Sequence, residues 1–181
     1  MCGIVGLFLK DKSLEPQLGA MLSQMLISLS DRGPDSAGIA IYGAPSKNEA
    51  KITIQSAKPD RDFRGLEAEL AKAIGTPVTI GVKSTHAVVR TTPAKIDEAR
   101  ETIQALRPDI RIMGAGDVVE IYKEVGLPEA VVDRFDVCKM TGTHGIGHTR
   151  MATESAVTTM GAHPFSTGAD QCLVHNGSLS N

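Results

Sequence analysis

The apolar run from Cys2 to Leu9 is the feature that most constrains how this chain can fold. The run is rich in isoleucine, valine and phenylalanine and ends at the polar cluster Lys10–Ser13, which is typical of a buried β-strand. No basic segment precedes it and it is far too short to span a bilayer, so we expect neither a signal peptide nor a membrane anchor. The extreme N-terminus is therefore predicted to lie in the interior.

Composition narrows the class of protein. The 181 residues are 41% hydrophobic, which is enough for one substantial core or two small ones. Lysine and arginine number 19 against 21 acidic residues, so no excess of positive charge favours nucleic acid or an anionic membrane as a partner. Three scattered cysteines without a CxxC pair indicate a reducing compartment. We expect a cytoplasmic protein that binds a small neutral or zwitterionic ligand.

The first third of the chain predicts strands and a helix. Apolar residues at three-and-four spacing from Leu18 to Leu29 predict an amphipathic helix that stops before Gly33. Strands are predicted at Ala37–Tyr42 and Lys51–Gln55, joined as a hairpin by the turn-like residues 43–46. The helix should cover a sheet.

The pattern of apolar residues changes in the middle of the chain. A helix pattern, a strand at Val78–Arg90, a second helix and two shorter strands follow one another between residues 60 and 125. We interpret residues 60–125 as a small α+β lobe inserted between residues 1–59 and 126–181, although periodicity alone also permits one continuous fold. A short helix and two strands are predicted after this block, and they carry the densest collection of glycine, histidine, asparagine and arginine.

Cys2 is the first candidate nucleophile. Removal of Met1 would leave a thiol and a free α-amino group on one residue. Such an amine has a pKa of about 8, close enough to that of a thiol, about 8.5, to take its proton as the sulfur attacks a carbonyl. Position alone equally allows Cys2 to be a small buried residue that opens a strand.

Four clusters together decide between these alternatives. In chain order they are Cys2–Gly6, Arg32–Gly38, Gly147–Thr153 and His175–Gly177. The set closely resembles class II glutamine amidotransferases, N-terminal-nucleophile hydrolases that include the glutaminase domains of glucosamine-6-phosphate synthase, asparagine synthetase and glutamate synthase. Residues 45–140 match none of these better-known members. The length and placement of that insert look most like the glutamate-synthase-related amidotransferase-like group that includes a subunit of N-methylglutamate synthase.

The resemblance implies a fold and a set of site residues. The fold is an α+β, four-layer αββα sandwich, which we expect to be incomplete at the C-terminus, because the carboxylate that holds the substrate amine in the family lies farther downstream than Asn181. Cys2 would form a glutamyl thioester, and the Asn176 side chain and Gly177 N–H would bind the oxyanion. An Asn-Gly pair is otherwise an ordinary turn dipeptide.

The resemblance also assigns groups that bind glutamine. Arg150 matches the arginine that pairs with the α-carboxylate, a task that suits a planar guanidinium. Arg32 and Gly33 match the motif beside the nucleophile, and Thr153 falls on a recurrent family position. Met151 stands where the family usually has an aromatic residue, so packing around the substrate is expected to differ.

A metal site is the weaker interpretation of the histidines. His144 and His148 lie four residues apart, but their segment is broken by glycine and strand-like, so this spacing does not place both rings on one helical face. We expect no metal and no cofactor.

The sequence thus predicts a glutaminase that releases glutamate and ammonia, with glutamine as substrate and a synthase subunit or domain as partner, within an oligomer. A flavin-dependent, glutamate-synthase-like or N-methylglutamate-synthase-like protein is the partner suggested by the resemblance. Two alternatives remain. The chain could be a non-catalytic glutamine- or glutamate-binding regulatory subunit, or an N-terminal-nucleophile hydrolase for another amide.

Overall fold

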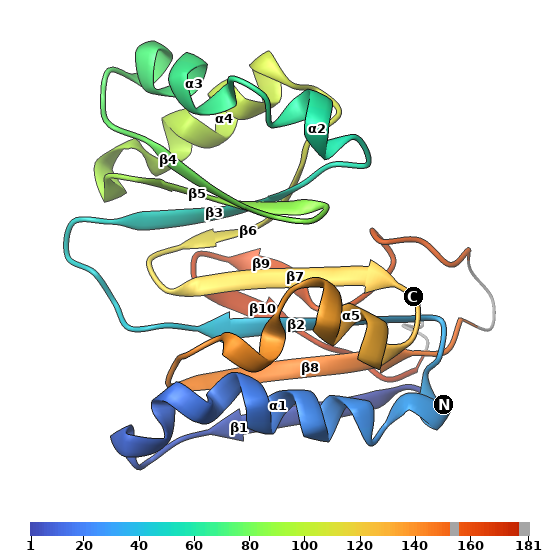
Figure 1. The fold of residues 1–181 in the computed structure, drawn as a ribbon. Coiled ribbons are helices and arrows are strands. Elements are labelled where there is room, and N and C mark those ends of the chain that lie inside the picture. Colours follow the sequence, from blue (N-terminus) through green and yellow to red (C-terminus); the bar gives the residue numbers. More distant parts are fainter. Residues whose placement is uncertain (153–155, 178–181) are drawn as a thin grey trace.

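The computed structural model describes residues 1–152 and 156–177, and these form a mixed α and β structure whose paired strands are all antiparallel (Figure 1). Two four-stranded sheets and one two-stranded sheet account for the strands of this part of the chain. The predicted α+β class is confirmed at this level.

The first sheet has the order β1-β8-β2-β7. Its strands are β1 (Gly3–Phe8), β8 (His144–Arg150), β2 (Ser36–Tyr42) and β7 (Val119–Val125). β2 is buried along its whole length, as expected for a central strand covered on both faces. β1 is an edge strand that alternates between buried and more exposed residues, with Ile4 and Phe8 exposed. The prediction of a fully buried first strand is therefore wrong for one of its two faces.

Helices cover one face of this sheet (Figure 1). They are α1 (Leu18–Ile27) and α5 (Pro128–Arg134), with the short 3-10 turns η1 (Lys12–Gln17), η2 (Ser30–Arg32) and η4 (Val137–Lys139). Leu18, Leu22 and Leu26 recur every four residues along one side of α1 and are completely buried against the sheet. This packing forms the largest apolar cluster among the described residues.

The second sheet has the order β4-β5-β3-β6. Its strands are β4 (Thr79–Lys83), β5 (His86–Thr91), β3 (Ala50–Gln55) and β6 (Arg111–Gly116), and its helices are α2 (Pro59–Asp62), α3 (Leu66–Ile74) and α4 (Ile96–Leu106), the last preceded by η3 (Pro93–Lys95). Ala87 and Val89 of β5 belong to the cluster that α3 and α4 cover. The alternate residues His86 and Val88 face the first sheet, where His86 packs edge-on against Phe135 at a ring distance of 4.9 Å.

A hairpin of β9 (Phe165–Gly168) and β10 (Gln171–Leu173) lies on the opposite side of the first sheet from α1. Its turn residue Asp170 accepts hydrogen bonds from three consecutive backbone amides, those of residues 117–119, at 2.8 to 2.9 Å. The hairpin is thereby fixed to the turn that joins β6 to β7.

The structure confirms most predicted elements and corrects two connections. β2 and β3 belong to different sheets, so the predicted hairpin is wrong. The long strand predicted at Val78–Arg90 is the hairpin of β4 and β5. The second sheet with its helices extends from residue 50 to 116, and β7 lies in the first sheet. The division into residues 1–59, 60–125 and 126–181 stays a prediction.

Gly19→Ala should destabilise the protein. A Cβ at Gly19 would lie 2.0 Å from the Val137 carbonyl oxygen and 2.6 Å from that of Met140, so α1 and η4 would have to separate. The overpacking, at least about 2 kcal/mol, exceeds the roughly 1 kcal/mol by which alanine is the better helix former. Urea unfolding measures the difference. Gly6→Ala is the matched control, because its nearest neighbour would be Ile146 Cγ2 at 3.9 Å, and equal stability of the two variants would contradict the prediction.

His86 should make the fold sensitive to acid. Burial lowers its pKa to about 4, so the unfolded chain binds a proton between pH 6.5 and 4 that the folded chain excludes. The free energy of unfolding should therefore fall as the pH drops through this window, by about 3 kcal/mol from this residue, with the loss complete below pH 4. His86→Phe should lose correspondingly less stability than the wild type between pH 7 and pH 4 in urea titrations. Parallel losses in the two proteins would show that His86 does not titrate as described.

Candidate functional site

The residues singled out from the sequence meet at one end of the first sheet. Gly3 of β1 is paired with Thr149 of β8, so Cys2 precedes and Arg150 follows this pair at the same end of two neighbouring strands. The pairing joins the two ends of the sequence that carry the motifs.

Alternation along the strands decides which face these side chains occupy. Thr149 points toward the C-terminal end of α1 and donates a hydrogen bond from its hydroxyl to the Leu29 carbonyl oxygen at 3.3 Å. Neighbouring residues of a strand point to opposite faces. His148 and Arg150 therefore lie on the face that α1 does not cover. Cys2, next to Gly3, shares this face, since a Cβ at Gly3 would point at Leu29.

The segment before β2 packs directly on the end of β8. A Cβ at Gly33 would lie 2.4 Å from the carbonyl carbon of Thr149, so no larger residue allows this approach. Asp35 makes two hydrogen bonds to the backbone at the end of β8. Its amide donates to the Arg150 carbonyl oxygen at 3.1 Å, and its carboxylate accepts from the Ala152 amide at 2.7 Å. Asp35 therefore fixes the backbone on both sides of Met151.

The segment after β10 returns to Cys2. The Asn176 side-chain amide donates a hydrogen bond to the Cys2 carbonyl oxygen at 3.1 Å. Gly177 follows with a positive φ of 126°, a conformation that favours glycine. The Asn-Gly pair thus occupies a turn, as its composition suggests, and this turn lies beside the candidate nucleophile.

Cys2 itself is half-buried. Its thiol lies 3.8 Å from the Met151 carbonyl oxygen, within the range of a weak hydrogen bond to that acceptor. The α-amino group of the chain is carried by Met1, which is exposed and contacts the Met151 sulfur at 3.3 Å. Hydrolysis of the bond between Met1 and Cys2 would therefore create the new amine beside the thiol.

Two histidines, His148 and His163, lie on the same side of the first sheet as Arg150. His148 is fully buried and donates from Nε2 to the His175 carbonyl oxygen at 2.9 Å, which leaves Nδ1 as the unprotonated nitrogen of a neutral ring. His163 stacks on it with a centroid distance of 4.3 Å. Burial lowers the pKa of both rings, that of His163 to about 4. Near neutral pH both rings are uncharged, so neither adds a positive charge beside Arg150.

The arrangement therefore offers a thiol, an amide donor and a guanidinium at one end of the sheet. Arg32 lies in η2 and is exposed, next to the tightly packed Gly33. Thr153 lies outside the described residues. Among the residues that the structure does describe, no group of three or more histidine, cysteine, aspartate or glutamate side chains could hold a metal ion. None of the described helices is long and apolar enough to cross a membrane.

Sequence reasoning missed two polar groups at this site. Asp35 was not assigned a role in this site, yet its carboxylate holds the backbone beyond β8. Lys123 of β7 was not singled out, although it is 2% exposed and lies on the same face as His148. The available signal was a charged residue at one of the alternate positions of β7, where Val119 and Ile121 have buried apolar side chains.

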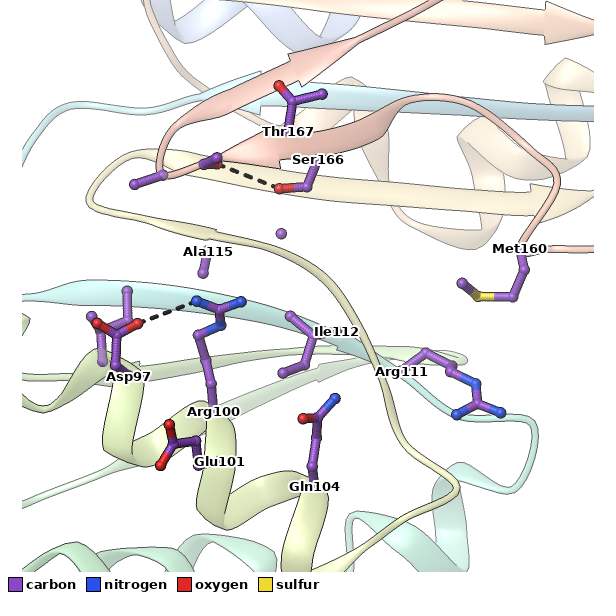
Figure 2. Close-up of a pocket in the computed structure, with 14 residues that line it drawn as sticks. Asp97, Arg100, Glu101, Gln104, Arg111, Ile112, Ala115, Met160, Ser166 and Thr167 are labelled. Atoms are coloured by element: carbon purple, nitrogen blue, oxygen red, sulfur yellow. Dashed lines mark hydrogen bonds and ion pairs between the residues drawn. The ribbon is translucent and has the colours of Figure 1, made fainter. Parts of the chain in front are cut away.

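A separate cleft of about 920 Å³ lies between α4, β6 and β9 (Figure 2). Arg100 and Gln104 reach into it from α4, and Met160 borders it from the opposite side. Asp97 engages Arg100 in an ion pair at 3.2 Å. Neither Cys2 nor Arg150 lines this cleft, so it is distinct from the site at the end of the first sheet.

Comparison with known proteins gives evidence on the protein class that is independent of the structure. The whole chain is 70% identical to "Glutamine amidotransferase-like protein GlxB" of Rhizobium meliloti and covers 60% of that protein. It is 35% identical to a "Putative glutamine amidotransferase" of Methanothermobacter thermautotrophicus and covers 62% of it. A segment of 71 residues, 39% of the chain, is 32% identical to "Glutamine--fructose-6-phosphate aminotransferase [isomerizing]" of Thermococcus kodakarensis and covers 12% of that protein.

The chain thus spans about three fifths of the length of the first two relatives. No protein-family model matches it. The similarities support a protein like the glutamine amidotransferases.

Asp35→Ala should loosen the chain beyond β8. The variant removes the carboxylate that accepts from the Ala152 amide, a bond to a charged acceptor that contributes about 1 kcal/mol at this half-buried position. Hydrogen exchange at the Ala152 amide should rise roughly fivefold. Asp35→Asn is the control, because its amide oxygen can still accept this bond. Unchanged exchange in Asp35→Ala would show that the carboxylate does not hold this segment.

Proposed function

We propose that this chain carries the catalytic groups of a class II glutamine amidotransferase, with Cys2 as the nucleophile that hydrolyses the side-chain amide of glutamine. The observation that supports this most strongly is the 3.1 Å hydrogen bond from the Asn176 side-chain amide to the backbone carbonyl oxygen of Cys2, which places an amide donor against the residue that carries the thiol. An amide donor next to a thiol is what acyl transfer requires, because charge develops on the substrate oxygen as the sulfur attacks. The similarity to glutamine amidotransferases over the whole chain agrees with this chemistry.

The proposed reaction begins after Met1 has been removed by hydrolysis. The α-amine of Cys2 accepts the thiol proton, and the sulfur forms a bond to the amide carbon of glutamine. The carbonyl oxygen becomes an oxyanion that the Asn176 side chain and the Gly177 N–H stabilise. Collapse of this intermediate breaks the carbon–nitrogen bond, and the nitrogen leaves as ammonia with the proton from the amine. Water then attacks the thioester and releases glutamate and the free thiol.

Arg150 is the proposed anchor for the α-carboxylate of glutamine. It lies on the same face as Cys2, and a guanidinium can bind a carboxylate with two parallel hydrogen bonds. The histidines behind it are neutral, so they do not compete for the carboxylate as cations. Gly33 and Arg32 are proposed to shape the wall beside the nucleophile, and Thr153 completes the proposed substrate-binding set.

The proposed fold is that of the N-terminal-nucleophile hydrolases. In this arrangement the layer formed by α1 and α5 covers one face of the first sheet, and the face that carries Cys2 lies in the interior of the αββα sandwich. The apolar cluster that links this face to β6 and β10 supports the assignment.

Ammonia is proposed to pass to a synthase subunit or domain. A flavin-dependent, glutamate-synthase-like or N-methylglutamate-synthase-like partner is the proposed recipient. Co-purification of the full-length protein from its native cells, followed by mass spectrometry, tests this link. The absence of a synthase from both the complex and the full-length gene product would contradict it.

Labelling with the reactive glutamine analogue diazo-oxo-norleucine tests the nucleophile directly. Intact-mass and peptide analysis of the full-length protein should find Met1 absent and one adduct on Cys2. Excess glutamine should protect the thiol, because it competes for the same site. A retained Met1 without an adduct, in the presence of the synthase partner, would remove the support for a glutaminase.

Two substitutions separate chemistry from binding. Cys2→Ser should lower glutaminase kcat by at least about a thousandfold while glutamine binding persists, because the carboxylate anchor is intact. Arg150→Lys should instead raise KM by about tenfold to a hundredfold, because an ammonium cannot form the paired hydrogen bonds of a guanidinium. Steady-state ammonia release measures both effects. Cys138→Ser, which removes an exposed free thiol of η4, is the matched control and should behave like the wild type.

The alternative function, a non-catalytic regulatory subunit that binds glutamine or glutamate, predicts a different result. Glutamine-dependent activity of the partner would then survive Cys2→Ser unchanged. The contact of the Asn176 amide with the backbone of the thiol-bearing Cys2 favours the catalytic proposal, since a binding subunit has no need of a cysteine at this position. Loss of ammonia transfer together with retained glutamine binding in Cys2→Ser would support the catalytic proposal.

A further inference from the structure

A buried lysine lies on the face that carries Cys2 and Arg150. Register across the first sheet places Ile4, His148, Gly38 and Lys123 in one row over all four strands. Lys123 is 2% exposed, yet no ion pair joins its ammonium to a carboxylate among the described residues. A buried ammonium needs other partners to offset its lost hydration.

The partners are backbone carbonyl groups of one loop. Lys123 Nζ donates to the carbonyl oxygens of Ala162 at 2.7 Å, Pro164 at 3.2 Å and Met160 at 3.5 Å. It also lies 4.4 Å from the centre of the Phe165 ring, within the range of a cation–π contact. All three donor positions of the ammonium are therefore directed at the loop formed by residues 160–164.

Gly38 leaves the space that the loop occupies. A Cβ at this position would lie 2.2 Å from the His163 carbonyl oxygen and 2.5 Å from Lys123 Cβ. The loop thus rests directly on the sheet, between the lysine and His148. The ring of His163 completes the contact by stacking on His148.

The same loop borders the guanidinium of Arg150. A Cβ at Gly161 would lie 3.4 Å from Arg150 Nη1 and 3.6 Å from Cζ, so the space between the loop and the guanidinium is no wider than one methyl group. Gly161 is itself fixed in a turn, because its amide donates to the Thr158 hydroxyl at 3.0 Å. A second anchor lies at the start of the turn, where the Thr159 hydroxyl donates to Glu124.

We propose that Lys123 is a positioning residue that holds the 160–164 loop on the sheet and thereby orients Arg150 toward the substrate carboxylate. This inference rests on the proposed function for the identity of the substrate. The link between the lysine and the loop is independent of it and can be tested separately.

Lys123→Met replaces the ammonium with an apolar chain of similar length. In the full-length protein, hydrogen exchange of residues 158–165 should rise at least tenfold, whereas residues 3–8 of β1 should be unaffected. KM for glutamine should rise about tenfold with kcat within twofold of the wild type, because Cys2 and Asn176 are untouched. Lys123→Arg keeps a buried cation and donors, and should recover part of the exchange protection and part of the KM effect.

Lys51→Met is the matched control, because Lys51 is a largely buried lysine of β3 whose ammonium binds Glu120 at 2.8 Å and does not contact the loop. It should leave loop exchange and KM unchanged. Unchanged loop exchange in Lys123→Met would overturn the anchoring role even if the protein hydrolyses no glutamine. A loosened loop with unchanged KM in an active enzyme would overturn the orientation of Arg150.

A second variant keeps the proposal testable if Lys123→Met fails to fold. Gly161→Val places a branched side chain where a Cβ alone would already lie 3.4 Å from Arg150 Nη1 and 3.2 Å from Thr158 Oγ1, and it leaves the lysine in place. KM should rise with kcat preserved, and thermal stability should stay near that of the wild type. An unchanged KM would contradict the contact between the loop and Arg150.

Discussion

The antiparallel pairing of β1 with β8 is the contact on which the site depends. It places the first residues of the chain beside residues 149–150, and it does so through backbone hydrogen bonds, which do not depend on the identity of the side chains other than proline. Gly3 and Gly33 allow the close approach of Leu29 and of the end of β8. Without this pairing, Cys2 and Arg150 would belong to unrelated segments.

Much of the fold could be predicted because its periodicities are strong. The three-and-four spacing of apolar residues from Leu18 to Leu29 predicts α1, and the apolar run after Cys2 predicts β1. Strand partners could not be predicted in the same way. β2 and β3 are close in sequence, but the spacing of apolar residues does not say whether two strands pair with each other or join different sheets. The exposure of Ile4 and Phe8 has the same origin, because an apolar run does not reveal how many faces are covered.

The residues of the candidate site could likewise be predicted only in part. Motif order indicated that Cys2, Arg150 and Asn176 belong together, and they share one end of the sheet. The role of Lys123 was hidden because its partners are backbone carbonyl groups, which every sequence contains. Cys138 is exposed in a short 3-10 turn, and in such a turn the spacing of apolar residues does not predict which side chains are buried.

The two large sheets are joined by polar as well as apolar contacts. Glu120 of β7 accepts from Lys51 of β3 at 2.8 Å and from the Tyr122 hydroxyl at 2.7 Å. Arg90 of β5 lies 3.6 Å from the same carboxylate. These groups hold the pKa of Glu120 below its usual value, so the carboxylate stays charged at neutral pH and keeps its partners.

The Asp170 side chain has a mechanical consequence for the whole molecule. It binds the three amides that follow β6, while its own amide donates to the Ala115 carbonyl oxygen at 3.1 Å. β6 belongs to the second sheet, and the hairpin that carries Asp170 leads within a few residues to Asn176. These hydrogen bonds therefore connect the end of the second sheet, through this hairpin, to the segment that touches Cys2. A displacement of β6 relative to the hairpin requires the bond to the Ala115 carbonyl to break, and a displacement of the β6–β7 turn requires the three bonds to the Asp170 carboxylate to break.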